Sequence, residues 1–308
     1  MTYNVITLKK GDFSAKINAT LGANLISLRN DKLGVKILRE PDYSAPLDNP
    51  YLYGAPLLFP VNRISGGKFN FEDREFNFPI NEQKTGCHLH GELHTLPFTI
   101  VNNSNSSVTL KYTISKDKPY LCYCEDLEIF VNYKLTKKGI IVKTSFKNNA
   151  KVSLPILFGY HTTFNSKFID NAEPIVKVEF ENEIERNMQN YLPTGKLLEF
   201  DSVSNELLSG TFNPLSTPIS RHYKCKNNGK IEIFDKTSKL KVVYKNSKNL
   251  PFRLIYNGNA DGYICLEPQT SMANSPNSPF DREFAGFNAV KPNKKQIFVS
   301  KILLKKGK

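Results

Sequence analysis

The sequence predicts an all-β fold, a single large β-sandwich. Three observations lead to this fold class. Short runs of β-branched and aromatic residues alternate with polar residues at a period of two, which is the spacing of side chains on one face of a strand. Gly, Asn, Asp and Lys turn residues separate these runs. No long segment shows the 3.6-residue periodicity of an amphipathic helix.

The strand-like runs occur from one end of the chain to the other. The first, "YNVITLKKGDFSAKIN", alternates on both sides of a turn at Lys10–Gly11. Five more follow in order: "SVTLKYTIS", "LEIFVNYKLTKKGIIVKTSFKNN", "KIEIFDKTSKLKVVYKN", "FRLIYNGNADGYICLEP" and "QIFVSKILLKK". Many short strands at such spacing are typical of a sandwich or barrel. The segments "FIDNAEPIVKVEF" and "RNMQNYLPTGKLLEF" are expected to form strand and loop, with at most a helical turn.

Four stretches rich in Pro, Gly, Asn and Ser lack the alternating pattern: residues 40–68, 84–97, 186–222 and 267–290. Loops of this length in a compact β domain are usually functional or act as linkers. They do not divide the chain into separately patterned halves, and no short internal repeat is visible. We therefore expect one domain that comprises residues 1–308.

Composition excludes several classes of protein. The net charge is +13, but the lysines occur as isolated doublets and Gly-rich aromatic RNA-binding motifs are missing, so we expect a basic solvated surface and no nucleic-acid partner. No run of about 18 apolar residues predicts a membrane span. The start of the chain lacks the pattern of a secretory signal, and five dispersed cysteines suggest reduced thiols, so a cytoplasmic location is expected.

A cluster of histidines stands out in "CHLHGELH", residues 87–94, which contains His88, His90 and His94. If the segment is extended, His88 and His90 share one face. A metal site would need a third and usually a fourth ligand, and the cluster resembles the metal-binding signature of cupins. Three readings are open from these residues alone: a metal site, a polar pocket, or no special role.

Three other segments carry candidate functional groups. "APLLFPVNRISGG" places Asn62 and Arg63 after an apolar loop, and Arg63 is either a surface residue or a pocket donor. "LPILFGYHTTFN" places His161 after an apolar strand, where a lone histidine is more often a packed core or rim residue than a catalyst. In "GYICLEPQT", Pro268 restricts the backbone of Glu267 to an extended conformation. A carboxylate held there and partly desolvated would have the raised basicity of a general base.

Taken in order, these segments resemble the aldose 1-epimerase (galactose mutarotase) family. The resemblance covers nearly the whole chain and consists of five short motifs in register: Asn62–Arg63–Ile64, Leu89–His90–Gly91, Gly159–Tyr160–His161 with Phe164–Asn165, Leu192–Pro193–Thr194–Gly195, and Glu267–Pro268–Gln269.

The resemblance implies a β-supersandwich with an open sugar cleft, a monosaccharide as the partner, and no metal or organic cofactor. It implies that Glu267 is the base on the anomeric hydroxyl and His161 the acid to the ring oxygen. By the same resemblance His90 and Arg63 bind and polarise the ring-oxygen region, and Asn62 and Gln269 are further substrate-binding groups. His88 and His94 inherit no role.

The chain departs from the family pattern at two positions in the sugar-binding shell. Ser220, in "ISRHYK", stands where the family has an aspartate, and Leu254, in "FRLIYNGN", stands where it has a glutamine. The nature of the sugar is therefore open. Two alternatives remain beside a free-aldose epimerase: a carbohydrate-binding or regulatory protein without turnover, and an epimerase of a phosphorylated hexose, for which Arg221 is a candidate contact.

Overall fold

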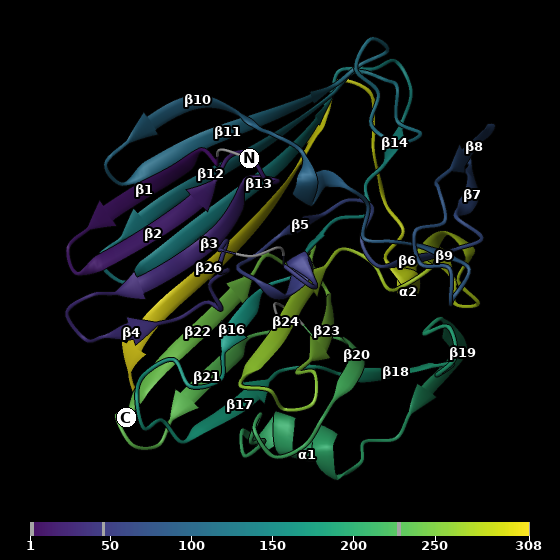
Figure 1. The fold of residues 1–308 in the computed structure, drawn as a ribbon. Helices are drawn as coiled ribbons and strands as arrows, with labels where there is room; N and C mark the ends of the chain where they lie inside the picture. Colours follow the sequence, from purple (N-terminus) through teal and green to yellow (C-terminus); the bar gives the residue numbers. More distant parts are fainter. Residues whose placement is uncertain (1–2, 45–46, 227–228, 308) are drawn as a thin grey trace.

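The largest sheet has eight antiparallel strands and forms one layer of a sandwich (Figure 1). In this computed structural model, residues 3–44, 47–226 and 229–307 are described. The strands of this sheet are, in spatial order, β10 (Thr99–Ser104), β11 (Ser107–Ile114), β12 (Leu127–Thr136), β13 (Gly139–Asn148), β26 (Lys295–Lys306), β22 (Leu240–Asn246), β21 (Ile231–Asp235) and β17 (Pro174–Val178).

A four-stranded sheet covers one end of that layer (Figure 1). Its strands, in spatial and chain order, are β1 (Val5–Lys10), β2 (Phe13–Asn18), β3 (Asn24–Asn30) and β4 (Val35–Lys36). The hydroxyl of Tyr133, on β12, donates to the carbonyl oxygen of Ala23 at 2.7 Å, so a buried polar contact joins the two sheets.

A second eight-stranded sheet covers the rest of the large layer and carries Glu267 and Gln269, two of the predicted site residues. Its strands are β19 (Pro193–Leu198), β18 (Asn182–Arg186), β20 (Ser220–Lys224), β23 (Phe252–Tyr256), β24 (Tyr263–Gln269), β15 (Gly159–Tyr160) and β5 (Leu57–Leu58), with β16 (Thr163–Asn165) also paired to β24. Hydroxyl contacts between Thr144 and Tyr160 at 2.7 Å and between Thr162 and Tyr244 at 2.9 Å connect it to the large sheet. The predicted all-β sandwich is confirmed.

Three small two-stranded sheets and short helices complete the described structure. The sheets pair β6 (Arg63–Ser65) with β9 (Cys87–Leu89), β7 (Lys68–Phe71) with β8 (Arg74–Asn77), and β14 (Leu154–Pro155) with β25 (Ala289–Val290). The helices are α1 (Ser202–Ser209) and α2 (Arg282–Ala285), and the 3-10 turns are η1 (Pro50–Leu52), η2 (Leu93–Thr95) and η3 (Ser275–Asn277). None of the helices in the described ranges is long and apolar enough to cross a membrane.

Helix α1 lies inside residues 186–222, a stretch in which the sequence shows no regular pattern. It begins where the Asp201 carboxylate accepts a hydrogen bond from the backbone N–H of Ser204, and it ends at Gly210 with φ 82°. These are ordinary N-terminal and C-terminal caps. The helix has only eight residues, and only Ser204 and Leu207 among them are buried. Two buried positions are too few to show a helical repeat in the sequence.

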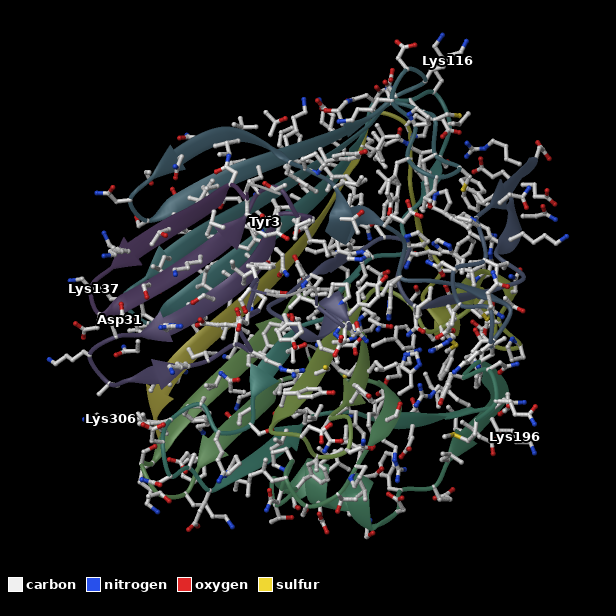
Figure 2. The ribbon with its side chains drawn as sticks, in the orientation of Figure 1. Tyr3, Asp31, Lys116, Lys137, Lys196 and Lys306 are labelled. Carbon is white, nitrogen blue, oxygen red and sulfur yellow. The ribbon has the colours of Figure 1, made fainter. Side chains whose placement is uncertain are left out.

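The alternation read from the sequence corresponds to burial. Along β12, every second side chain from Leu127 to Leu135 is buried, and these side chains face the covering sheets. Lys116, Lys137, Lys196 and Lys306 lie at the periphery (Figure 2), whereas a few charged side chains, Glu267 among them, are buried. The five cysteines are free thiols.

Candidate active site

A cleft of about 420 Å³ contains five of the six residues predicted to form the site. This volume is within the usual range for small-molecule pockets, about 300–1,000 Å³. Its wall includes Asn62, Arg63, His90, His161 and Glu267. A larger hollow, about 530 Å³, lies over β17, β21, β22 and β26, but its polar lining consists mainly of lysines and it holds none of the five histidines. The convergent acid, base and amide groups mark the smaller cleft as the functional one.

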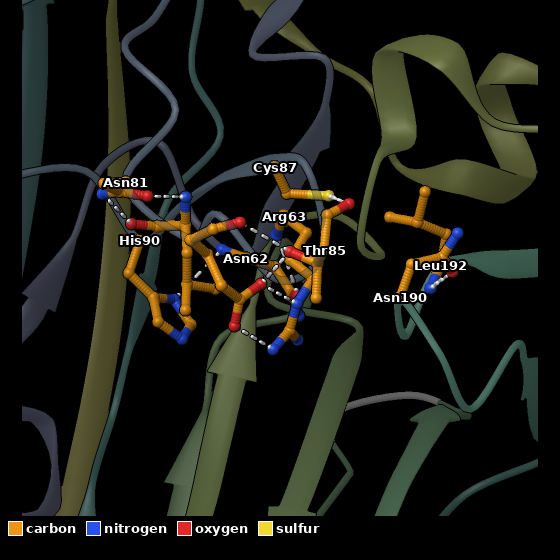
Figure 3. Close-up of polar contacts among 10 residues, drawn as sticks. Asn62, Arg63, Asn81, Thr85, Cys87, His90, Asn190 and Leu192 are labelled. Carbon is orange, nitrogen blue, oxygen red and sulfur yellow. Dashed lines mark hydrogen bonds and ion pairs between the residues drawn. The ribbon is translucent and has the colours of Figure 1, made fainter.

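The two-stranded sheet of β6 and β9 positions Arg63 and His90. Arg63 pairs with Leu89, and the Asn81 side chain holds Leu89 from the outside by accepting from its N–H at 2.6 Å and donating to its carbonyl oxygen at 2.9 Å (Figure 3). Asn62 and His90 then exchange hydrogen bonds: His90 N–H donates to the Asn62 carbonyl oxygen at 3.1 Å, and Asn62 N–H donates to His90 Nδ1 at 3.3 Å. These two hydrogen bonds at the end of the β6–β9 sheet fix the orientation of the imidazole.

Glycine is required directly after His90. Gly91 has φ 62°, and a Cβ at this position would lie 1.9 Å from the carbonyl oxygen of Phe59. His90 and Asn62 also have left-handed φ values, 62° and 63°. Left-handed conformations of non-glycine residues are uncommon and often occur at functional sites.

Glu267 lies near the end of β24 and is completely buried. Its Oε2 accepts a hydrogen bond from Gln269 Nε2 at 3.2 Å, and the Gln269 amide oxygen accepts from Asn62 Nδ2 at 3.0 Å. Burial raises the pKa of Glu267 to about 8; the Gln269 hydrogen bond and the charges of Arg186 and Arg63 oppose that rise. In the free protein at neutral pH the carboxyl group therefore holds a proton.

His161 follows β15 and contacts Glu267 directly, with 3.2 Å between His161 Nε2 and Glu267 Oε1. Burial lowers the pKa of His161 to about 3, and burial also lowers the pKa of His90 well below its usual value. Burial therefore favours the uncharged forms of both groups, a protonated Glu267 carboxyl and a neutral His161 imidazole. Two titratable groups at this distance can act as an acid and a base.

Arg63 is held in place by a carboxylate and an aromatic ring. Its Nε and Nη2 donate to the two carboxylate oxygens of Glu82 at 2.6 and 2.7 Å, and its guanidinium lies 4.6 Å from the centre of the Tyr191 ring. The bidentate pair lowers the pKa of Glu82, although its burial opposes this. Arg63 therefore enters the cleft with its charge already balanced.

The remaining predicted residues have other surroundings. Gln269 lies behind Glu267, and both ends of its amide are occupied by Asn62 and Glu267. His88 is buried beside Phe78 with Nδ1 2.7 Å from the carbonyl oxygen of Pro79. His94 packs against Tyr51. The metal reading of "CHLHGELH" finds no support in these placements, since His88 and His90 do not converge on a common point.

Another set of donors does converge. One ligand atom each of His90, His161 and Glu267 lie within 4.8 Å of one another, so these three residues could hold a divalent cation. The sequence did not predict this combination as a metal set, because its members are far apart in the chain.

Sequence reasoning missed several residues of the cleft. Tyr51 packs against the rings of His90 and His161, and Arg186 and Tyr191 also line the cleft. The position of Arg186, five residues before Tyr191 of "YLPTG", gave no signal, since "NEIER" has the alternation of an ordinary surface strand. Glu82 was equally hidden in a polar loop.

Comparison with known proteins gives a consistent picture. The family model described as aldose 1-epimerase matches residues 4–308. The uncharacterized protein YihR of Escherichia coli strain K12 is 28% identical over 158 residues, 51% of this chain, and the match spans about half of that protein (48%).

Solved structures share the fold over almost the full length. A galactose mutarotase-like protein from Clostridium acetobutylicum has a TM-score of 0.92 at 28% identity, with 99% of this chain and 98% of that chain covered. A galactose mutarotase-like protein from Lactobacillus casei has a TM-score of 0.74 at 18% identity, with 98% and 100% covered. The galactose 1-epimerase of Lactobacillus acidophilus has a TM-score of 0.69 at 14% identity, with both chains covered completely. The last two likenesses show the fold alone.

Proposed function

Since the chain belongs to the aldose 1-epimerase family, we propose that it interconverts the α and β anomers of an aldose, with Glu267 and His161 as the proton-transfer pair. The observation that carries the proposal is the buried pair itself, with 3.2 Å between His161 Nε2 and Glu267 Oε1 in the wall of the cleft. Ring opening needs one base and one acid at the same time, and a pair that shares one proton supplies both.

The reaction proceeds from the tautomer in which Glu267 is a carboxylate and His161 is protonated. Sugar hydroxyls that enter the cleft favour this tautomer because they solvate the ion pair. The Glu267 carboxylate accepts the proton of the anomeric hydroxyl while the imidazolium protonates the ring oxygen. The bond between C1 and the ring oxygen breaks and C1 becomes an aldehyde. Rotation about C1–C2 and the reverse transfers close the ring as the other anomer, with protons and electrons balanced.

The neighbouring groups prepare this step. Because His90 Nδ1 accepts the Asn62 N–H, the hydrogen of the neutral ring is on Nε2, which makes it a donor for the ring-oxygen region. Arg63, fixed by Glu82, orients the sugar. We assign Gln269 a positioning role, since its amide holds one oxygen of Glu267 and leaves the other to His161.

The first test is the optical rotation of freshly dissolved α-glucose and α-galactose with and without the protein. We expect the approach to equilibrium to accelerate in proportion to protein concentration. The alternative, a sugar-binding protein without turnover, is favoured by Ser220 and Leu254 at positions where the family has hydroxyl-binding side chains. Binding detected by calorimetry with no acceleration for any aldose would select that alternative.

The pH dependence of kcat/KM should follow the shared proton. Because burial raises the pKa of Glu267 to about 8, we expect kcat/KM to be level near neutral pH and to fall as pH rises through about 8, where the pair loses its only proton and with it the acid. The measurement is anomer exchange by NMR at equilibrium, corrected for the spontaneous rate at each pH. A value of kcat/KM that still increases at pH 9 would contradict a singly protonated active form.

Removal of metal ions should leave the activity unchanged. The acid–base pair performs both proton transfers, so dialysis against EDTA is expected to alter kcat by less than about twofold, well short of what loss of an acid or base causes. Metal analysis of the dialysed protein is the control. Loss of activity that a divalent cation restores would instead assign His90, His161 and Glu267 as metal ligands.

A further inference from the structure

Arg186 brings a second positive charge into the cleft. It is the last residue of β18 and lines the cleft together with Glu267 and Ser220. Its Nη2 donates to the carbonyl oxygen of Ser220 and, at 3.1 Å, to the Ser220 hydroxyl. Burial lowers the pKa of Arg186 to about 10, so the guanidinium remains charged at neutral pH.

No carboxylate in the described part of the chain forms an ion pair with Arg186. The nearby carboxylates are engaged elsewhere. Glu82 binds Arg63, while Glu183 and Asp201 bind Arg221 at 2.7 and 2.6 Å.

Arg221, the candidate phosphate contact in the sequence, is therefore already neutralised. It also lies outside the cleft, because alternate residues of β20 point to opposite faces and Ser220 faces the sugar site.

The charge of Arg186 is not balanced within the cleft. Arg63 and Arg186 approach the same Tyr191 ring, at 4.6 and 5.8 Å from its centre, and each repels the other. Glu82 compensates one guanidinium, and Glu267 is protonated in the free protein. The empty cleft thus has an excess of one positive charge, which a ligand anion would neutralise.

The two departures from the family pattern fit this charge. An aspartate at position 220 would lie against Arg186 and cancel its charge, but the chain has a serine whose hydroxyl accepts from Arg186. Leu254, next to Glu267 across the β23–β24 pair, offers no hydrogen bond to a sugar hydroxyl. Compared with the family pattern, the sugar-binding residues of this chain lack two side chains that bind neutral hydroxyls. The guanidinium of Arg186, in contrast, is present and has no carboxylate partner within the described ranges.

A second hollow, about 450 Å³, adjoins the cleft and shares Arg186, Met188 and Ser220 with it. It contains His222, which is fully buried and whose ring nitrogens have no hydrogen-bond partner among the described residues. Of the carboxylates of this hollow, Glu183 pairs with Arg221, whereas Glu185 accepts from the Thr194 hydroxyl and forms no ion pair with Arg186. The hollow and the ring nitrogens of His222, which have no hydrogen-bond partner in the described part of the chain, therefore both lie beside Arg186.

We infer that the sugar which this protein handles carries an anionic group, a carboxylate or a phosphate, and that Arg186 binds that group where the two hollows meet. That the ligand is a sugar rests on the proposed function. The inference itself concerns the charged substituent of that sugar and not the acid–base pair. A guanidinium presents paired N–H donors that match two oxygens of either anion. His222, directly beside this position, supplies a further neutral donor.

The test compares acidic with neutral sugars on the full chain. Anomer exchange is measured by NMR at pH 7 for D-glucuronate, D-glucose 6-phosphate and D-glucose. We expect kcat/KM for one of the two acidic sugars to exceed that for glucose by about 10- to 100-fold, the factor of a charge-assisted hydrogen bond. Which acidic sugar is preferred distinguishes carboxylate from phosphate.

Variants at positions 186 and 220 then test whether Arg186 is the residue that binds the anionic group. Arg186→Met should reduce the acidic-to-neutral ratio of kcat/KM by about 10- to 100-fold, and Arg186→Lys should reduce it less, because charge is kept but the paired donors are lost. Ser220→Asp should reduce the ratio as well, because it supplies a carboxylate partner to Arg186. Lys137→Met, at the periphery of the large sheet, removes one charge at a distance and should leave the ratio as in wild type.

The outcomes separate the inference from the proposed function. Equal kcat/KM for acidic and neutral sugars, together with an unaltered ratio in Arg186→Met, would overturn the anionic substrate while the epimerase activity stands. If no sugar is turned over, calorimetric binding decides: glucuronate or glucose 6-phosphate bound tightly by wild type and weakly by Arg186→Met supports the anion site without catalysis. Equal or absent binding of all three sugars would refute it.

Discussion

Glu267→Gln is expected to reduce kcat/KM for anomer exchange by at least about 10²- to 10⁴-fold, the usual contribution of a placed acid or base. The amide keeps the size of the carboxyl group and can still accept from Gln269, but it cannot take up the proton of the anomeric hydroxyl. Polarimetry or NMR exchange measures the loss. Glu199→Gln, at an exposed position directly after β19 (Pro193–Leu198), is the matched control.

His161→Asn is expected to have a similar effect, and the double variant should be little worse than either single one. Residues that share one proton act as a unit, so their separate losses do not add. If the two losses multiplied in the double variant, Glu267 and His161 would be acting independently, and the shared-proton mechanism would be wrong.

The same Glu267→Gln variant is expected to be more stable than wild type in alkaline solution. Burial raises the pKa of Glu267 to about 8 in the folded protein, from an ordinary value of 4.5. The folded state therefore binds more protons than the unfolded state between these values, and wild-type stability falls as pH rises from about 4.5 to 8. Glutamine does not titrate and can donate to His161 Nε2, so it avoids this loss.

The free energy of unfolding of the variant should exceed that of wild type by about 2–4 kcal/mol at pH 9 and by much less at pH 5. Urea unfolding at the two pH values measures the difference. Glu199→Gln should show no such pH-dependent gap, because its carboxylate is exposed in both states. A gap of equal size at pH 5 and pH 9 would mean that packing, and not the buried charge, separates the two proteins.

The sheets were largely predictable because alternation along a strand is a local property. Every second residue of β12 and β13 is buried, and the pattern is visible without knowledge of the partners. Helix α1 was missed because its signal consists of two caps, Asp201 and Gly210, on a short segment with only two buried residues.

The site was predictable only in part, since it depends on contacts between distant segments. The resemblance predicted Glu267 and His161 as the proton-transfer pair, and the raised basicity expected for Glu267 agrees with its burial. It did not indicate that burial would also place the resting proton on Glu267 and not on His161. Arg186 gave no local signal, because its importance depends on the lack of a carboxylate next to it in space.

The position of β26 has a consequence for how the chain folds. Residues 295–306 pair with β13 on one side and β22 on the other, so the last strand of the chain is internal to the large sheet. Until these residues are synthesised, β13 and β22 both have open edges that can pair with another chain. The hydrogen bond from Asn62 to Gln269 closes a loop of 207 residues. Folding should therefore be slow and late in synthesis, and chains interrupted before residue 295 should aggregate.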